Sequence, residues 1–174
     1  MRICLTGGIA CGKSLLSAFL RELGVEIVDA DDIVHELLPD ADERRRLAAE
    51  VFTDPVKRRA LEQRLHPIVR ARINHALAAA GERLAIAVVP LLFEVQWQAD
   101  YDIICAVVSS RELQLERMIS HRGYTREEAE ARLAAQLPVE TKAEKSHYVI
   151  WNNASAEELR QKAQDLVVWL KSQV

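Results

Sequence analysis

The segment from Gly7 to Ser14 constrains the fold of this chain more than any other. Its sequence, GGIACGKS, fits the pattern GxxxxGK[ST] and holds three of the six glycines of the chain. A short run of strand-forming residues at positions 2–6 precedes it, and an amphipathic helical pattern follows it. This is the context in which a glycine-rich loop binds phosphate groups. The segment therefore predicts a strand, a phosphate-binding loop and a helix in succession.

The residue types of this loop explain the chemistry that we expect of it. Glycine lets the backbone turn tightly, so that successive N–H groups point at phosphate oxygens, and the N-terminus of the following helix adds partial positive charge. Lys13 would reach the β- and γ-phosphates of a nucleoside triphosphate, and Ser14 would supply an oxygen to Mg²⁺. The alternative is a glycine turn that only joins a strand to a helix. We interpret Cys11 as a small filling residue rather than a reactive thiol.

The rest of the chain alternates between short strand patterns and longer helical patterns. Buried strands are predicted at 2–6, 25–29, 84–89, 102–108 and 147–151. Each of these runs is short and most are rich in Val or Ile, as in strands that are covered on both faces. Strand–helix alternation predicts an α/β fold with a five-stranded parallel sheet.

Residues 30–83 contain no strand candidate, and the sequence predicts a helical insertion there. Its helices are expected at about 30–38, 41–51, 55–65 and 67–80. Pro39, Pro55 and Pro67 separate them, because proline is unfavourable inside a helix but suits a first turn. A second helical segment is expected at about 125–145, where Thr125 and Glu128 have the spacing of a capping box.

Composition excludes several classes of protein. The 174 residues favour a single domain over 1–174, and 49% hydrophobic residues with a net charge of −3 exclude disorder as the main state. No basic tract predicts a nucleic-acid partner. The three cysteines form no CxxC, so neither a zinc site nor a disulfide framework is expected. We expect a reducing, cytoplasmic location. No signal peptide or membrane-spanning run is evident.

Acidic residues follow two of the predicted strands. Asp29, Asp31 and Asp32 come after the second strand, and Glu94 follows the third. Ligands of parallel α/β sheets bind at the carboxyl ends of the strands. A carboxylate there can accept a proton from a substrate hydroxyl or hold Mg²⁺ through water, and Asp31 is the best candidate. The alternatives are helix capping for the aspartates and an ordinary surface acid for Glu94.

Further motifs join the phosphate loop GGIxxGKS and the acidic segment DAD at 29–31. They are LHP at 65–67, VVPLLxE at 88–94, Gln114, Arg117, HRG at 121–123, TREEA at 125–129, Arg132, AQLP at 135–138, Lys142 and Asn152. In this order, the motifs resemble those of the dephospho-coenzyme A kinase family. The resemblance covers nearly the whole chain. It implies a P-loop kinase core with a helical acceptor-binding insertion at 30–83 and a small helical lid at 122–145. The activity it implies is transfer of the γ-phosphoryl group of ATP to the 3′-hydroxyl of dephospho-coenzyme A.

The resemblance also implies roles for individual residues. Nucleotide binding would involve Gly7, Gly8, Ile9, Ala10, Cys11, Gly12, Lys13, Ser14, Leu15 and Asn152. Catalysis would involve Lys13, Asp31 and Arg122. Contacts with the acceptor would come from Asp31, His66, Glu94 and Arg117, and Mg²⁺ would bind at Ser14. His66 has a second interpretation as a break between two helices, and Trp97 and Trp169 are interpreted as packing residues.

The chain departs from the family pattern in three places. The helical insertion is short between Pro39 and the helix expected at 41–51. Ser146-His147 and Trp151 stand where the family often has acidic residues, and Leu15 replaces a threonine. Two alternatives therefore stay open: a related P-loop kinase for another nucleotide-like or small hydroxyl acceptor, and an inactive ATP-binding module. We expect a monomer or weak homo-oligomer whose partners are small molecules, with no nucleic acid and no membrane.

Overall fold

The computed structural model describes residues 1–173, apart from the side chains at positions 48, 52, 53 and 55. Within this range, one parallel sheet has five strands in the order β2-β3-β1-β4-β5. The strands are β1 (Ile3–Gly7), β2 (Glu26–Asp29), β3 (Ala85–Val88), β4 (Ile103–Val108) and β5 (Tyr148–Trp151). All five predicted strands are confirmed, each to within one residue at either end.

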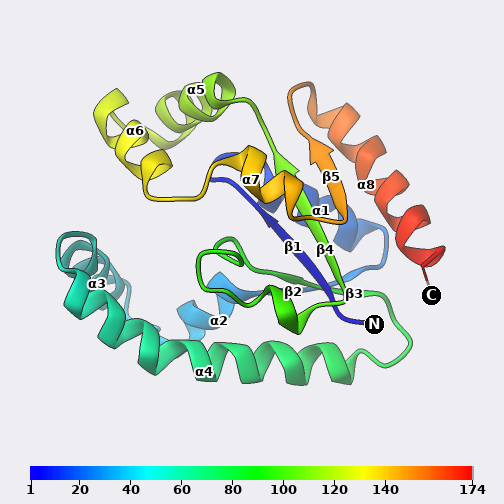
Figure 1. The fold of residues 1–174 in the computed structure, drawn as a ribbon, viewed down its shortest axis with the longest axis horizontal. Helices are drawn as coiled ribbons and strands as arrows, with labels where there is room; N and C mark the ends of the chain where they lie inside the picture. Colours follow the sequence, from blue (N-terminus) through cyan, green and yellow to red (C-terminus); the bar gives the residue numbers. More distant parts are fainter. Residues whose placement is uncertain (174) are drawn as a thin grey trace.

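Helices cover both faces of this sheet (Figure 1). On one face, α1 (Lys13–Glu22) and α8 (Ala156–Lys171) bury Leu16, Leu20 and Leu166 against the strands. On the other face, α2 (Ala30–Leu37) and α4 (Pro55–Ala79) pack together with the loop that follows β3. The central strands β1 and β4 are buried along their whole length, as their nearly continuous apolar sequences predict.

The helical insertion has a different construction from the prediction. The helix α3 (Ala41–Thr53) packs against α4, and α4 continues for 25 residues with Pro67 inside it. The prediction of two helices separated at Pro67 is therefore wrong. Pro67 and Gln63 are both exposed, so water can bind the carbonyl that loses its N–H donor to the proline. Val69 and Ile73, two and six residues farther on, are buried in the core and anchor the helix.

The segment after β4 forms three helices, α5 (Arg111–Arg122), α6 (Arg126–Ala134) and α7 (Val139–Glu144). The capping box of Thr125 and Glu128 at the start of α6 is confirmed. The helical segment expected at about 125–145 consists of two helices, α6 and α7, and Pro138 is the N-cap residue of α7. A short 3₁₀ helix, η1 (Gln98–Asp100), precedes β4. No helix within residues 1–173 is long and apolar enough to cross a membrane.

Three smaller expectations also agree with the structure. All three cysteines, Cys4, Cys11 and Cys105, are free and buried. The ring of Trp97 is buried and meets the ring of His66 edge-on, with 5.1 Å between their centroids. The ring of Trp169 lies 4.7 Å from that of Tyr148, so both tryptophans contribute to packing as predicted.

Candidate active site

The glycine-rich loop joins the carboxyl end of β1 to the N-terminus of α1. Two of its glycines have backbone conformations that other residues rarely adopt, with φ of 147° at Gly7 and 91° at Gly12. A Cβ atom on Gly7 would lie 2.0 Å from the carbonyl oxygen of Val107, and one on Gly12 would lie 2.3 Å from Nδ2 of Asn152. The loop is thus packed closely against the ends of β4 and β5, and glycine is required at both positions.

Lys13 folds back over this loop. Its ammonium group donates hydrogen bonds to the carbonyl oxygens of Gly7, at 2.9 Å, and Gly8, at 2.7 Å. Burial lowers the pKa of Lys13 to about 8, and the nearby cations Lys142 and Arg122 act in the same direction. An anion bound in the loop would reverse this shift, because it favours the charged form of the amine.

A cavity of about 480 Å³ opens beside the loop. It is lined by Lys13, Ser14, Asp31 and Arg122, among others, so the structure brings together the three residues predicted to be catalytic and the predicted Mg²⁺ ligand. Leu15 and the loop from Ile9 to Gly12 complete one wall. We refer to this space as the nucleotide cavity.

The three aspartates that follow β2 divide into separate roles. Asp29 is the N-cap of α2, since its carboxylate accepts the N–H of Asp31 at 2.9 Å. Burial raises the pKa of the Asp29 carboxyl group. Asp32 lines a groove between β2 and α4. Asp31 alone of the three lines the nucleotide cavity, so capping explains Asp29 but not Asp31.

Arg117 and Asn152 hold the glycine-rich loop by hydrogen bonds to its backbone carbonyl oxygens. The guanidinium group of Arg117 donates to the carbonyl oxygens of Ala10, at 3.3 Å, and Asn152, at 3.0 Å, and to Oγ of Ser109, at 2.9 Å. The side-chain amide of Asn152 donates to the carbonyl oxygen of Cys11 at 2.9 Å. The structure therefore places Arg117 at the nucleotide cavity, with Asp31, whereas His66 and Glu94 line a different cavity.

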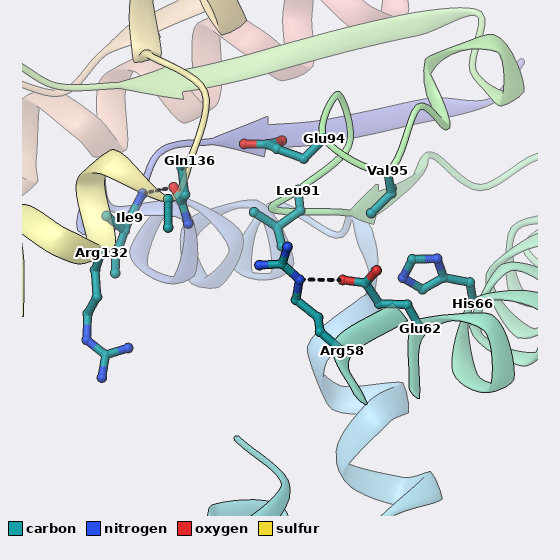
Figure 2. Close-up of a pocket in the computed structure, with 10 residues that line it drawn as sticks. Ile9, Arg58, Glu62, His66, Leu91, Glu94, Val95, Arg132 and Gln136 are labelled. Atoms are coloured by element: carbon teal, nitrogen blue, oxygen red, sulfur yellow. Dashed lines mark hydrogen bonds and ion pairs between the residues drawn. The ribbon is translucent and has the colours of Figure 1, made fainter. Parts of the chain in front are cut away.

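A second cavity, of about 600 Å³, lies next to the first (Figure 2). We refer to it as the acceptor cavity. Arg58, Glu62 and His66 line it from α4, and Glu94 lines it from the loop after β3. His66 and Glu94, which the sequence predicts to contact the acceptor, are thus brought together from distant parts of the chain. Since α4 continues through Pro67, His66 is not a helix break.

Lys142 is a residue of this site to which the sequence assigned no role. Its side chain is fully buried, and its ammonium group lies 2.8 Å from Oε1 of Glu94 and 3.0 Å from the carbonyl oxygen of Pro90. The N–H of Leu137 also donates to Oε1 of Glu94, at 3.0 Å. Glu94 is therefore a held carboxylate and not an ordinary surface acid. In the sequence, Lys142 is one of the residues that carry the family resemblance, and it shares a helix face with Val139, three residues earlier.

Fold and site together define a class of protein, the P-loop kinases. Solved structures agree with this assignment. The structure of TT1252 from Thermus thermophilus matches with a TM-score of 0.81 and 31% identity, covering 98% of this chain and 97% of that one. The dephospho-CoA kinase from Campylobacter jejuni matches with a TM-score of 0.72 and 25% identity, covering 99% and 98%. A shikimate kinase from Acinetobacter baumannii, 20% identical with a TM-score of 0.64, shares the fold.

Sequence comparisons narrow the class to one family. The family model described as dephospho-CoA kinase matches residues 1–43 and 41–158. The dephospho-CoA kinase of Anaeromyxobacter dehalogenans is 40% identical over 97% of this chain and 92% of its own length. That of Geobacter sulfurreducens is 36% identical over 97% of both. The chain belongs to the dephospho-CoA kinase family.

The comparisons also locate a difference from the family. The family model matches in two pieces that meet at residues 41–43, at the start of α3. The alignment with the Anaeromyxobacter dehalogenans protein extends over 193 positions, more than the 174 residues of this chain. Some positions of the relative therefore have no counterpart here. The break lies where the sequence suggests that the helical insertion is short.

Proposed function

We propose that this protein transfers the γ-phosphoryl group of ATP to the 3′-hydroxyl of dephospho-coenzyme A. The observation that carries the proposal is the adjacency of the two cavities. One contains a phosphate-binding loop with Lys13 and Asp31, and the other is lined by His66 and Glu94. Phosphoryl transfer depends mainly on placing donor and acceptor in line and on stabilising charge, and neighbouring cavities provide that placement.

In this proposal Asp31 is the general base. It accepts the proton of the acceptor hydroxyl as the oxygen bonds to the γ-phosphorus and the bond to the bridging oxygen of ADP breaks. Lys13 leaves the carbonyl oxygens of Gly7 and Gly8 and donates to the β- and γ-phosphates instead. Because it is buried, its charge is weakly screened and interacts strongly with the phosphates.

Arg122 and Asn152 complete the nucleotide half of the proposed site. Arg122 is exposed at the end of α5, at the base of the proposed lid, and closure would bring its charge onto the phosphates or the adenine. Asn152 and Arg117 act before the lid closes, because they hold the phosphate loop in its binding conformation. A closed lid would also exclude water, which would otherwise compete with the acceptor for the phosphoryl group.

The residues present fit a Mg²⁺ ion that is held largely by the nucleotide. The described residues contain no cluster of three or more potential His, Cys, Asp or Glu ligands. Mg²⁺ in kinases needs few protein ligands, because substrate phosphates and water supply most of its coordination. The hydroxyl of Ser14 would hold the ion, and Asp31, which lines the same cavity, would act on it through water. Bound Mg²⁺ would neutralise part of the phosphate charge.

On the acceptor side, Glu94 and His66 would contact dephospho-coenzyme A. Oε1 of Glu94 is occupied by Lys142 and Leu137, whereas its buried Oε2 has no hydrogen-bond partner among the described residues. A buried carboxylate oxygen without a partner is costly, and a hydroxyl of the substrate would satisfy it. We further propose a monomer or weak homo-oligomer in the cytoplasm, whose reducing conditions suit three free thiols.

A coupled assay of ADP release tests the proposal. Purified protein with Mg²⁺ and ATP is compared with and without dephospho-coenzyme A, and the product is identified by mass. Acceptor-dependent ADP release with formation of coenzyme A is expected. No release, or release that is indifferent to the acceptor, would overturn the proposal.

The break at residues 41–43 favours one other candidate, a kinase for a different hydroxyl acceptor. The break lies in the helical insertion, whose helix α4 lines the acceptor cavity, whereas the phosphate loop lies inside the first matched piece. This candidate predicts ADP release with another nucleotide-like or small hydroxyl compound and none with dephospho-coenzyme A. The same assay with a panel of acceptors distinguishes the two.

A further inference from the structure

Two residues, Ile9 and Gln136, line both the nucleotide cavity and the acceptor cavity. They are the only residues common to the two linings among those that the structure describes. Figure 2 shows Gln136, in the segment after α6, beside Ile9 of the phosphate loop. A phosphoryl group that passes from a nucleotide in one cavity to a hydroxyl in the other must cross this boundary.

The side-chain amide of Gln136 has a defined orientation there. Its Oε1 accepts the backbone N–H of Ile9 at 3.0 Å, across 127 positions of the sequence. Because only the oxygen can accept, this bond leaves Nε2 as a donor. No hydrogen bond joins Nε2 to any other described residue.

The backbone around this contact is fixed from several sides. The carbonyl oxygen of Ile9 accepts Nε2 of the buried Gln114 at 2.7 Å. The next residue after Gln136, Leu137, donates its N–H to Glu94 at 3.0 Å. Glu94 is in turn held by Lys142 at 2.8 Å. The free amide of Gln136 is therefore held in place at the boundary of the two cavities and needs little reorganisation to act on a ligand there.

We propose that Nε2 of Gln136 donates a hydrogen bond to the phosphoryl group during transfer, while Oε1 holds the phosphate loop. The inference rests on the proposed phosphoryl transfer. In that step the bond from the γ-phosphorus to the ADP oxygen breaks, the bond to the acceptor oxygen forms, and the acceptor proton passes to Asp31. Gln136 exchanges no atom and stabilises charge on the transferring oxygens. A neutral, directed donor complements the more mobile charge of Lys13.

Two substitutions separate this role from a purely structural one. Gln136→Glu keeps an oxygen that accepts the N–H of Ile9 but replaces the donor with a carboxylate. Gln136→Met keeps the approximate shape and loses both functions. If Gln136 only held the loop, Gln136→Glu would retain activity and Gln136→Met would not. Gln63→Glu, the same change at an exposed position of α4 outside both cavities, is the matched control.

We expect kcat for coenzyme A formation at pH 7.5 to fall at least about 10-fold in both variants of Gln136, and to stay unchanged in Gln63→Glu. A protonated glutamic acid regains an O–H donor, so the kcat of Gln136→Glu relative to wild type should rise as the pH falls toward 5.5. The same ratio for Gln136→Met should stay flat. Near-wild-type kcat in Gln136→Glu at pH 7.5 would overturn the proposal.

A binding measurement makes the test independent of the acceptor. Calorimetry compares Mg·ADP with a non-hydrolysable triphosphate analogue, in wild type and in Gln136→Met. We expect similar ADP affinity and a several-fold loss of affinity for the analogue, because only the analogue carries the γ-phosphoryl group. An unchanged ratio of the two affinities would overturn the role of Gln136 even if dephospho-coenzyme A were not the acceptor.

Discussion

The nucleotide half and the acceptor half of this site are built in different ways. The phosphate loop is held by Gln114, Gln136, Arg117 and Asn152, which bond its backbone from three separate segments of the chain. The acceptor cavity is lined from α4 and from the loop after β3, and α3 packs against α4 without a described residue in that lining. Among the residues of α3 whose side chains are described, none is buried.

The ion pairs of the two halves show the same contrast. Lys142 and Glu94, between the halves, have side-chain exposures of 0% and 18%. Arg58 and Glu62 on α4, which also line the acceptor cavity, have exposures of 56% and 42% with 3.9 Å between the charged atoms. The nucleotide half is thus fixed by buried contacts. By contrast, α3 and the first turns of α4 form an exposed arm, which we call the acceptor arm, and its length can change at modest cost. The break from the family at 41–43 lies in that arm.

The largest effect is expected from Lys13→Met, which removes the charge at the centre of the nucleotide half. We expect kcat/KM for ATP to fall by about 10³-fold, as for loss of one buried charge-stabilising donor. The measurement is steady-state kinetics, with Lys171→Met at the exposed C-terminal end of α8 as control. A loss below 10-fold would contradict this role.

The same substitution should stabilise the free protein, because it removes a desolvated charge. The pKa of Lys13 is lowered from 10.5 to about 8 in the folded protein, so between these values the unfolded chain binds more protons. The wild-type free energy of unfolding therefore gains from this group as the pH rises through that window. The advantage in Tm of Lys13→Met over wild type should be largest near pH 7 and shrink toward pH 10. Thermal unfolding without ligand measures it, and an advantage that grows with pH would contradict it.

Lys142→Met tests the buried pair that joins the halves. Removing one partner leaves Glu94 as a largely buried charge without its cation. We expect the free energy of unfolding to fall by about 3 kcal/mol, at the lower end of the range for broken buried pairs because Glu94 keeps some exposure. Urea unfolding measures this change. A fall in the free energy of unfolding of less than about 1 kcal/mol would show that this pair contributes no more than an exposed ion pair.

Asp31→Asn should separate binding from chemistry. We expect kcat to fall by about 10²-fold while the Kd for ATP stays nearly unchanged, because a general base acts on the acceptor hydroxyl. Asp32→Asn is a close control, since the neighbouring Asp32 lines the groove beside α4 and not the nucleotide cavity. Near-normal turnover in Asp31→Asn would remove Asp31 from the mechanism.

The smallest effect on stability is expected from Arg58→Ala, on the acceptor arm. The exposed pair with Glu62 should contribute less than about 1 kcal/mol to the free energy of unfolding. If Arg58 contacts the acceptor, the KM for the acceptor rises several-fold and the KM for ATP does not. Equal changes in both KM values would show that Arg58 does not act on acceptor binding alone.

Much of the fold follows from local sequence patterns. All five strands, the capping box at Thr125 and the phosphate loop were predictable, because each depends on neighbouring residues or on short periodicity. The continuation of α4 through Pro67 was not predictable. Whether a proline ends a helix depends on solvent access to the freed carbonyl and on anchoring by later turns. Both are properties of the folded molecule.

The sequence by itself determined that this chain has a phosphate loop on a parallel sheet, and which acids follow which strands. Only the tertiary structure decided that Asp29 caps a helix while Asp31 lines the nucleotide cavity. It also decided that Lys142 meets Glu94, and that Gln136 meets Ile9 across 127 residues. The physical reason is the distance in sequence between the residues that interact. Spacing along the chain fixes which residues share a helix face or a strand end, whereas contacts between distant segments depend on how the whole core packs.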